Sequence, residues 1–414
     1  MPDQTFRHDA CQTMTALSTK QAEALSPLSE HKNINPPELH RSTITAAIML
    51  ISTAEEMNPT RRNTMEDVHV IHAPQKWDAP HPMASFIGIY DGHGGRLIVD
   101  YLGDHLAKNV AQEWTFERKG GDGGSNNDVA VAATGRKRRL PRNDNDDDNS
   151  DDSEEEQKEK DDGEMIRNSL ERAFLLTDIQ SRMAGLTTSG ATVVCTIIIP
   201  NFDKKGNCTE IEIHAANAGD ARAVLSSTVA RSASATNIFN SDTINNAVRI
   251  TEDHKSTDAS EIERIKAAGG TMIRNRVMGI LAVARSLGDH GLKEFVIAKP
   301  HLSTTVVKIA ESDHDDDNDE MDGSDNNGKG GAQPVTTNNN NTSSTSHPYT
   351  NGEFLIVACD GLWDVMEDDE AVSAVRAHVA KNGMASRTDV ASILVTEALE
   401  RGSTDNITVV VYWL

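Results

Sequence analysis

Short runs of apolar residues, each bounded by turn-forming residues, constrain the fold of this chain more than any other feature. The runs are six to eight residues long and rich in Val and Ile, which favour extended backbone, and they are shorter than a typical buried helix. They therefore predict strands. These runs occupy residues 85–90, 192–199, 210–216, 354–359 and 407–413, and a further run at 68–71 alternates apolar and polar residues.

Longer stretches with apolar residues at helical spacing predict helices at residues 96–116, 164–183, 259–268, 369–381 and 389–401. Gly269 and Gly402 follow two of them, at the position where a left-handed residue commonly ends a helix. The segment 217–220 (Asn-Ala-Gly-Asp) joins two apolar runs and resembles a hairpin turn. Strand clusters that alternate with helix pairs predict an α+β fold, in which helices cover an antiparallel sheet or sandwich.

Negative charge is concentrated in two low-complexity stretches. Thirteen acidic residues and two lysines lie between Asp144 and Glu164, and nine acidic residues without lysine or arginine lie between Glu311 and Asp325. These stretches carry 20 of the 24 net negative charges of the chain, so the remainder is close to neutral. They bury too little apolar area to offset the conformational entropy that ordering would cost.

The composition along the chain predicts a mobile N-terminal tail at residues 1–45 and one domain at 46–414. Low-complexity insertions interrupt this domain at about 118–164, 226–246 and 311–351. The middle insertion is rich in Ser, Ala and Asn and predicts an enlarged hairpin loop. Without the tail and the insertions roughly 250 residues remain, which is the size of a single domain.

Several features predict a soluble protein of the cytoplasm, the nucleus or both. The four cysteines form no CxxC pair, and Cys195 and Cys359 lie in apolar runs, as small buried hydrophobes do. No signal peptide is evident, and the apolar stretch Ile44 to Ile51 is too short to span a bilayer. The basic cluster at 135–139 is either a nuclear import signal or a solvated charge run. Overall acidity argues against nucleic-acid binding.

Four short segments place carboxylates at strand ends beside turn-forming residues. The key acidic residues are Glu66 with Asp67, then Asp91, Asp360 and Asp405. Hard cations such as Mg²⁺ and Mn²⁺ prefer oxygen ligands, and several converging carboxylates would repel one another without a cation between them. Each segment taken alone is equally typical of an ordinary turn or a solvated strand end.

Eight segments in order resemble motifs of the protein phosphatase 2C family, the metal-dependent serine/threonine phosphatases. They are 65–67 (Met-Glu-Asp), 91–95 (Asp-Gly-His-Gly-Gly), 189–192 (Ser-Gly-Ala-Thr), 217–220 (Asn-Ala-Gly-Asp), 253–255 (Asp-His-Lys), 281–289 (Leu-Ala-Val-Ala-Arg-Ser-Leu-Gly-Asp), 359–364 (Cys-Asp-Gly-Leu-Trp-Asp) and 404–406 (Thr-Asp-Asn). The resemblance extends over residues 56–414, apart from the polar insertions. Within the family the chain looks most similar to fungal members that act on stress-activated kinase cascades.

The resemblance implies a central antiparallel β-sandwich flanked by antiparallel helix pairs, a four-layer α-β-β-α arrangement. It also implies two Mg²⁺ or Mn²⁺ ions per subunit. Asp91 would bridge both ions, Glu66 and the Gly92 carbonyl would bind one, and Asp360 and Asp405 would bind the other. Two ions about 3.5–4 Å apart lower the pKa of a bridging water from about 16 towards about 7, so that it can attack phosphorus.

The resemblance assigns further roles around these ions. Arg62 matches the residue that binds the phosphate, and a guanidinium fork suits two phosphate oxygens. His93 would protonate the departing alkoxide, although a histidine in such a turn can also be purely structural. The remaining polar residues are candidates either for a third, weaker metal site or for positions that orient the ligands: Asp67, Thr192, Asp220, Asp364 and Asn406.

Four other residues are expected to take no direct part in the chemistry. Arg285 and Asp289 follow the segment that forms a flap in the family, and we expect them to support it. Trp363 is expected in the core rather than against a substrate. Cys359 precedes a predicted ligand, but nothing near it in sequence activates a thiolate, so we do not expect a cysteine-phosphatase mechanism.

The predicted function is hydrolysis of phosphoserine and phosphothreonine in proteins, with activated protein kinases among the expected substrates. We expect a monomer that binds neither nucleic acid nor membranes. One alternative is a catalytically silent scaffold of the same fold that binds phosphoproteins, although the presence of all four principal carboxylates disfavours it. Another is a metal-dependent nuclease, which would need a basic groove that the motif segments lack beyond Arg61 and Arg62.

Overall fold

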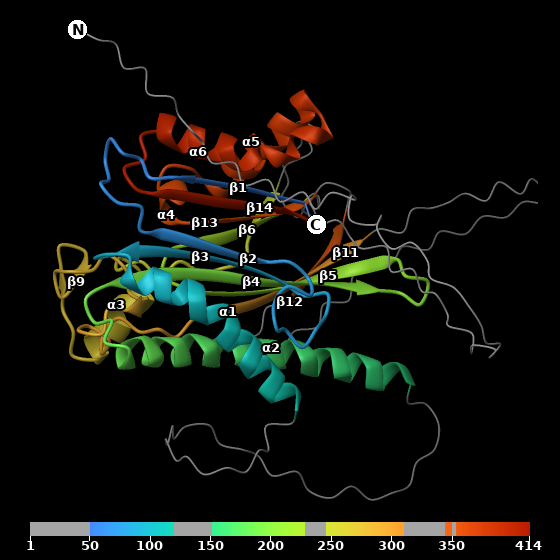
Figure 1. The fold of residues 1–414 in the computed structure, drawn as a ribbon, viewed down its shortest axis with the longest axis horizontal. Coiled ribbons are helices and arrows are strands. Elements are labelled where there is room, and N and C mark those ends of the chain that lie inside the picture. Colours follow the sequence, from blue (N-terminus) through green and yellow to red (C-terminus); the bar gives the residue numbers. More distant parts are fainter. Residues whose placement is uncertain (1–49, 120–150, 228–245, 310–343, 350–352) are drawn as a thin grey trace, which may run out of the picture.

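The computed structural model describes residues 50–119, 151–227, 246–309, 344–349 and 353–414 (Figure 1). Two sheets form its centre. The first contains, in spatial order, β1 (Leu50–Glu56), β14 (Ile407–Trp413), β13 (Phe354–Ala358), β6 (Arg222–Ser227) and β7 (Asn246–Arg249). All of its strand pairs are antiparallel.

The second sheet is larger. Its order is β12 (Ser344–Tyr349), β11 (His301–Ile309), β5 (Cys208–Ala218), β4 (Gly190–Phe202), β3 (Ser85–His93) and β2 (Asp67–His72), and β10 (Leu287–Gly288) also pairs with β4. Its strand pairs are antiparallel apart from β11 with β12, which run parallel. A separate hairpin joins β8 (Met272–Ile273) and β9 (Arg276–Val277).

Helices cover the outer face of each sheet, which gives the expected four layers (Figure 1). On the first sheet lie α4 (Asp360–Trp363), α5 (Asp368–Asn382), the 3₁₀ helix η1 (Met384–Thr388) and α6 (Val390–Glu400). On the second lie α1 (Leu97–Arg118) and α2 (Asp151–Met183), while α3 (Ala259–Ala267) packs beside the β8–β9 hairpin. None of the described helices is long and apolar enough to cross a membrane.

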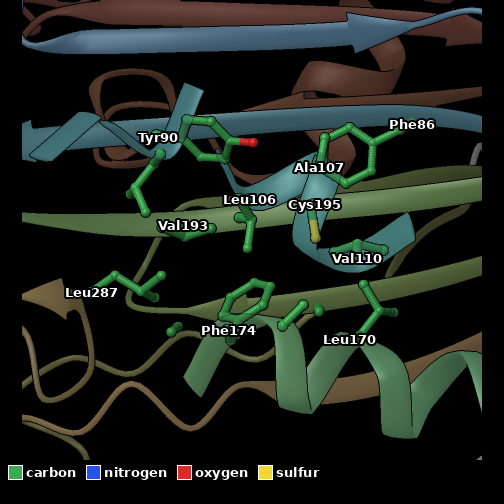
Figure 2. Close-up of a cluster of buried hydrophobic side chains, with 14 of the residues drawn as sticks. Phe86, Tyr90, Leu106, Ala107, Val110, Leu170, Phe174, Val193, Cys195 and Leu287 are labelled. Carbon is green, nitrogen blue, oxygen red and sulfur yellow. The ribbon is translucent and has the colours of Figure 1, made fainter. Parts of the chain in front are cut away.

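The apolar runs form continuous strands because both faces of each sheet are buried. Along β3, Phe86 and Tyr90 face α1 and α2 and belong to the same buried cluster as Phe174 of α2 (Figure 2). The alternate residues Ile87 and Ile89 point to the other side, into the core between the two sheets. This alternation is the period of a strand, so the run at 85–90 is apolar at almost every position. Burial of Cys195 and Cys359 follows for the same reason.

Most predicted elements are present, and Gly269 and Gly402 have the expected positive φ of 86° and 90°. The turn at 217–220 is not a hairpin, because β5 belongs to the larger sheet and β6 to the smaller one. The same turn residues also suit a short link between two sheets, so the local sequence does not distinguish such a link from a hairpin turn. The predicted enlarged hairpin does join the antiparallel strands β6 and β7, although its connecting residues 228–245 fall outside the described part.

The start of α2 and the strands β1, β11 and β12 differ from the predictions. Helix α2 begins at Asp151, well before residue 164, so the end of the first acidic insertion is helical. Strand β1 was not predicted, because its sequence mixes Ser, Thr and Glu with few apolar residues; it is an edge strand that pairs with β14 over seven positions. The predicted tail at 1–45 and most of the insertions at 118–164 and 311–351 lie outside the described residues.

Candidate active site

Three of the predicted polar residues lie side by side across the larger sheet. In the strand register Asp67 on β2 is opposite Asp91 on β3, and Asp91 is opposite Thr192 on β4. Ligand atoms of Asp67 and Asp91, together with the sulfur of Cys359, lie within 4.8 Å of one another. The antiparallel pairing of neighbouring strands therefore brings together residues that are more than 100 positions apart in the chain.

The smaller sheet supplies the other two carboxylates. Asp360 is the first residue of α4 and follows β13, and Asp405 lies two residues before β14, the strand paired with β13. Both residues consequently reach the same edge of the sandwich. Both also lie close enough to Asp91 for their negative charges to raise the pKa of the Asp91 carboxyl. The site thus spans the two sheets.

The donor set fits a hard divalent cation. Burial, followed by repulsion from neighbouring carboxylates, raises the pKa of both Asp91 and Asp360 well above the usual range. Burial raises the pKa of Asp67 to about 6. One carboxylate oxygen of Asp67 and one of Asp360 are buried without a hydrogen-bond partner. Unpaired, mutually repelling oxygens of this kind are compensated when a cation lies among them.

Cys359 is close to the carboxylates but unsuited to the same ion. Burial raises the pKa of its thiol well above the usual value, so the sulfur stays protonated. The sulfur accepts a hydrogen bond of 3.1 Å from the backbone N–H of Thr408. A neutral thiol is a poor ligand for Mg²⁺ or Mn²⁺, which favour oxygen. Cys359 therefore forms part of the wall of the site.

Gly92 allows the segment that carries Glu66 to lie directly on β3. Its N–H donates to the Glu66 carbonyl oxygen at 3.2 Å. A Cβ atom at position 92 would lie 2.5 Å from that oxygen and 2.8 Å from the side chain of Val99, so only glycine fits. The backbone of Glu66 and Gly92 is thereby held beside Asp91.

Asn406 holds the same segment from the other side. Its side-chain oxygen accepts a hydrogen bond of 2.8 Å from the N–H of Glu66. Its amide nitrogen donates to the carbonyl oxygens of Met57 at 2.8 Å and Thr64 at 3.1 Å. The amide is fully used in these bonds, so Asn406 orients the Glu66 segment. No feature of the sequence around Asn406 indicates these distant partners.

Arg62 lies at the edge of the site, and its guanidinium forms an ion pair with the Asp405 carboxylate. Its Nε also donates to the carbonyl oxygen of Thr404 at 3.3 Å. The side chain of Arg62 is 43% exposed, so it remains accessible to a ligand. An arginine that pairs with a carboxylate presents the same donor fork that binds a phosphate.

His93, at the end of β3, faces Asp289. Its Nε2 lies 2.8 Å and 3.0 Å from the two carboxylate oxygens of Asp289. Asp289 was expected to support the flap, and its contact with His93 was not predicted from the sequence. Arg285, which was expected to support the same flap, pairs with Glu261 of α3 at 2.6 Å.

The candidates for a third metal position are divided between buried and exposed locations. Asp220 is buried, and among the described residues one of its oxygens has no hydrogen-bond partner. Burial raises the pKa of Asp220 to about 6, although the positive charge of Lys255 lowers it in part. The hydroxyl of Thr192 is likewise buried and unpaired. Asp364 is exposed and forms an ion pair of 2.7 Å with Lys255. Trp363 is buried in the core, as predicted, beneath the Arg222 guanidinium at 5.0 Å.

Comparison with known proteins identifies the family. The profile described as "Protein phosphatase 2C" matches residues 137–407, which is more than half of the chain. The chain belongs to the protein phosphatase 2C family. It is therefore a protein serine/threonine phosphatase of a metal-dependent family, which confirms the resemblance seen in the sequence.

Individual relatives extend the similarity to the segments before residue 137. The chain is similar to Protein phosphatase 2C homolog 1 of Schizosaccharomyces pombe, with 28% identity over 88% of this chain and 73% of that protein. It is also similar to Protein phosphatase 2C homolog 1 of Saccharomyces cerevisiae, with 26% identity over 88% of this chain and 93% of that protein.

A solved phosphatase 2C structure has the same fold. The serine-threonine phosphatase 2C from Toxoplasma gondii superimposes with a TM-score of 0.54 and 15% identity, covering 88% of this chain and 94% of that chain. The protein phosphatase 2C fold of this chain is thus the predicted α+β sandwich.

Proposed function

We propose that this phosphatase 2C binds two Mg²⁺ or Mn²⁺ ions and uses them to hydrolyse phosphoserine and phosphothreonine in other proteins. The observation that carries this proposal is the convergence of Asp91 from the larger sheet and Asp360 from the end of a strand of the smaller one. Among the described residues, one buried oxygen of Asp360 and one of the neighbouring Asp67 have no hydrogen-bond partner. A single cation would leave part of this negative charge uncompensated.

In this proposal Asp91 would be the central ligand of the ions. Glu66, the Gly92 carbonyl, Asp360 and Asp405 would supply the other oxygen ligands around it. Asp67 is held by the Thr408 hydroxyl, which donates to it at 2.7 Å, so it orients the ligands from behind. When bound, the ions supply Lewis acidity that activates the attacking water and neutralises charge on the phosphoryl group.

Arg62 and His93 act on the substrate. Arg62 exchanges its carboxylate partner Asp405 for two oxygens of the phosphate, which fixes the phosphorus in line with the attacking water. His93 donates a proton to the serine or threonine oxygen as the P–O bond breaks. Water attack gives free phosphate directly, so no covalent enzyme intermediate forms.

The test is release of phosphate from a phosphothreonine peptide with and without a chelator. We expect chelation to abolish the activity and Mn²⁺ to restore it. Asp91→Asn should reduce the activity at least 100-fold while the protein stays folded by circular dichroism, because the variant keeps the shape of the side chain. Asp100→Asn is a matched control, since Asp100 is exposed on α1 and, among the described residues, pairs only with Arg96. Activity that resists chelation would contradict the proposal.

We also propose that activated protein kinases are among the substrates, in the cytoplasm or nucleus, which is what the resemblance to fungal phosphatase 2C members implies. A panel of phosphorylated kinases, treated with the wild-type protein and with Asp91→Asn, would identify those that lose phosphate. Equal phosphate loss with both proteins would count against any kinase in the panel. Fluorescence microscopy after alanine replacement of the basic cluster at 135–139 tests whether that cluster directs nuclear import.

A further inference from the structure

We propose that Asp289 positions His93 for proton donation, so that Nδ1 of His93 is the atom that serves the leaving serine or threonine oxygen. This inference rests on the proposed function. It goes beyond it by assigning a role to Asp289, which lies 196 positions from His93 in the chain and does not contact the carboxylates of the metal site through any described hydrogen bond.

Asp289 is firmly held. Its side chain is 9% exposed, and the Ser286 hydroxyl donates to one of its oxygens at 2.5 Å. Its backbone N–H donates to the carbonyl oxygen of Ser189 at 3.0 Å, and its φ of 46° lies in the left-handed region. A Cβ atom at Gly190 would lie 2.1 Å from the Asp289 carboxylate, so the absence of a side chain there creates the room that Asp289 occupies.

The carboxylate determines which nitrogen of His93 carries hydrogen. An ionised carboxylate only accepts hydrogen bonds, so Nε2 must be the donor in this pair. Although burial by itself raises the pKa of Asp289, the hydrogen bond and charge of His93, with Ser286 and Lys293, bring that pKa below its usual value. Asp289 is therefore ionised. Within the described residues Nδ1 has no hydrogen-bond partner, so it is the nitrogen available to a substrate.

Cleavage of the P–O bond is accompanied by proton transfer from His93 to the leaving oxygen. Water attacks phosphorus, the P–O bond to the serine or threonine breaks, and its electron pair passes to the leaving oxygen. The Nδ1 proton of the His93 imidazolium moves to that oxygen, which leaves a neutral imidazole still donating from Nε2 to Asp289. The proton that the attacking water loses goes to solvent, and His93 regains its own proton from solvent. Asp289 stabilises the imidazolium and fixes its orientation without changing its own protonation.

Two substrates separate this role from a structural one. A phosphothreonine peptide has a poor leaving group that needs a proton, whereas p-nitrophenyl phosphate has a good one that does not. We expect Asp289→Asn to lower kcat for the peptide about 100-fold and to change kcat for p-nitrophenyl phosphate less than about threefold. His290→Gln is the matched control, because His290 is the next residue but contacts Ser181 instead.

A double-mutant cycle supplies the second criterion. If Asp289 acts through His93, then adding Asp289→Asn to His93→Gln should cause no further loss with the peptide. Equal losses on both substrates, or additive losses in the double variant, would overturn the proposal. Should Asp289→Asn fail to fold, Ser286→Ala removes the hydrogen bond that holds Asp289, and it should slow the peptide alone by about tenfold. A loss on both substrates, or none, would again overturn the proposal.

The same assays distinguish this inference from the proposed function. If the wild-type protein hydrolyses neither substrate with Mn²⁺ present, or if a chelator has no effect, the proposed function fails. If the wild type is active and sensitive to chelation but the selective loss is missing, only the role of Asp289 fails.

Discussion

Gly361 follows Asp360 at the start of α4 and packs against the segment that leads from Asp405 into β14. Its Cα packs against the backbone of Asn406, and an added Cβ would lie 1.9 Å from the Asn406 carbonyl oxygen. The φ of Gly361 is not in the left-handed region, so the restriction is one of space alone. Because glycine has no Cβ, α4 and the segment before β14 can approach closely enough for Asp360 and Asp405 to contribute to one site.

Replacing Gly361 with alanine should force these two backbones apart. We expect the free energy of unfolding to fall by about 1–3 kcal/mol, as for other overpacked sites, and the affinity for Mn²⁺ to fall with it. Denaturant unfolding and calorimetric titration with Mn²⁺ measure the two effects. Gly291→Ala is the control, because no atom of the described part of the chain lies within 4 Å of a Cβ at that position. If Gly361→Ala kept the wild-type free energy of unfolding and the wild-type affinity for Mn²⁺, the prediction would be wrong, because the two backbones could then separate without a free-energy cost.

Asn406 acts on the metal site at a distance, through the backbone of the Glu66 segment. Asn406→Ala removes three hydrogen bonds to that segment and leaves the carboxylates in place. We expect the affinity for Mn²⁺ to fall 10–100-fold, as when residues that orient metal ligands are removed elsewhere. Calorimetric titration provides the measurement, with Asn382→Ala on the exposed face of α5 as the control. An unchanged affinity would mean that Glu66 keeps its position without Asn406.

At the scale of elements, Arg222 on β6 connects three parts of the smaller sheet layer. Its guanidinium pairs with Asp253, which follows β7, at 2.5 Å, and with Asp368, at the start of α5, at 2.6 Å. It also stacks over Trp363 of α4 at 5.0 Å. Arg222 is only 5% exposed, so the charges of Asp253 and Asp368 depend on it for compensation.

Arg222→Met should therefore destabilise the protein strongly, because it leaves two carboxylates short of a partner in a partly buried position. We expect the free energy of unfolding to fall by about 3 kcal/mol, measured by denaturant unfolding. The matched control is Arg401→Met on the surface, where the arginine pairs with Glu370 and Glu397, and its unfolding midpoint should barely move. A similar small effect for both variants would show that Arg249, the other partner of Asp368, is sufficient.

At the scale of the whole molecule, the stability of the fold should depend on pH through His254, which lies near the link between the two sheets. His254 is 1% exposed, and its Nδ1 lies 3.2 Å from the carbonyl oxygen of Gly219. Burial, together with the charge of Arg285, lowers its pKa from 6.5 to about 4. The folded protein therefore keeps this imidazole neutral, while the unfolded chain protonates it below pH 6.5.

The stabilisation from a neutral His254 is fully present above pH 6.5 and is lost as the pH falls towards 4. Between these values the unfolded chain binds a proton that the folded protein does not, so the free energy of unfolding falls by about 3 kcal/mol from this residue. His254→Gln removes this titration. We expect the wild-type protein to lose about 3 kcal/mol more than the variant between pH 7.5 and pH 4, measured by denaturant unfolding across that range. Parallel curves would contradict the assignment.

The sequence by itself determined the elements and the identity of the candidate ligands. Apolar runs predict strands because their residues are buried on both faces, as Phe86 and Ile87 on β3 illustrate. Helix ends were predictable at Gly269 and Gly402, because a left-handed residue is a local requirement. The acidic residues at strand ends were recognisable from their neighbours and from the order of the motifs. Strand β1 was not, because an edge strand needs few apolar residues.

Only the tertiary structure decided which residues meet. The turn at 217–220 joins two sheets instead of two paired strands. Asn406 contacts Glu66, 340 positions away, and Asp289 contacts His93, 196 positions away. Local sequence encodes backbone conformation and burial, whereas these contacts depend on how the two sheets stack and where their strand ends converge. The pairing of His93 with Asp289 arises in this way, because Gly190 on a neighbouring strand leaves room for a carboxylate that follows a distant loop.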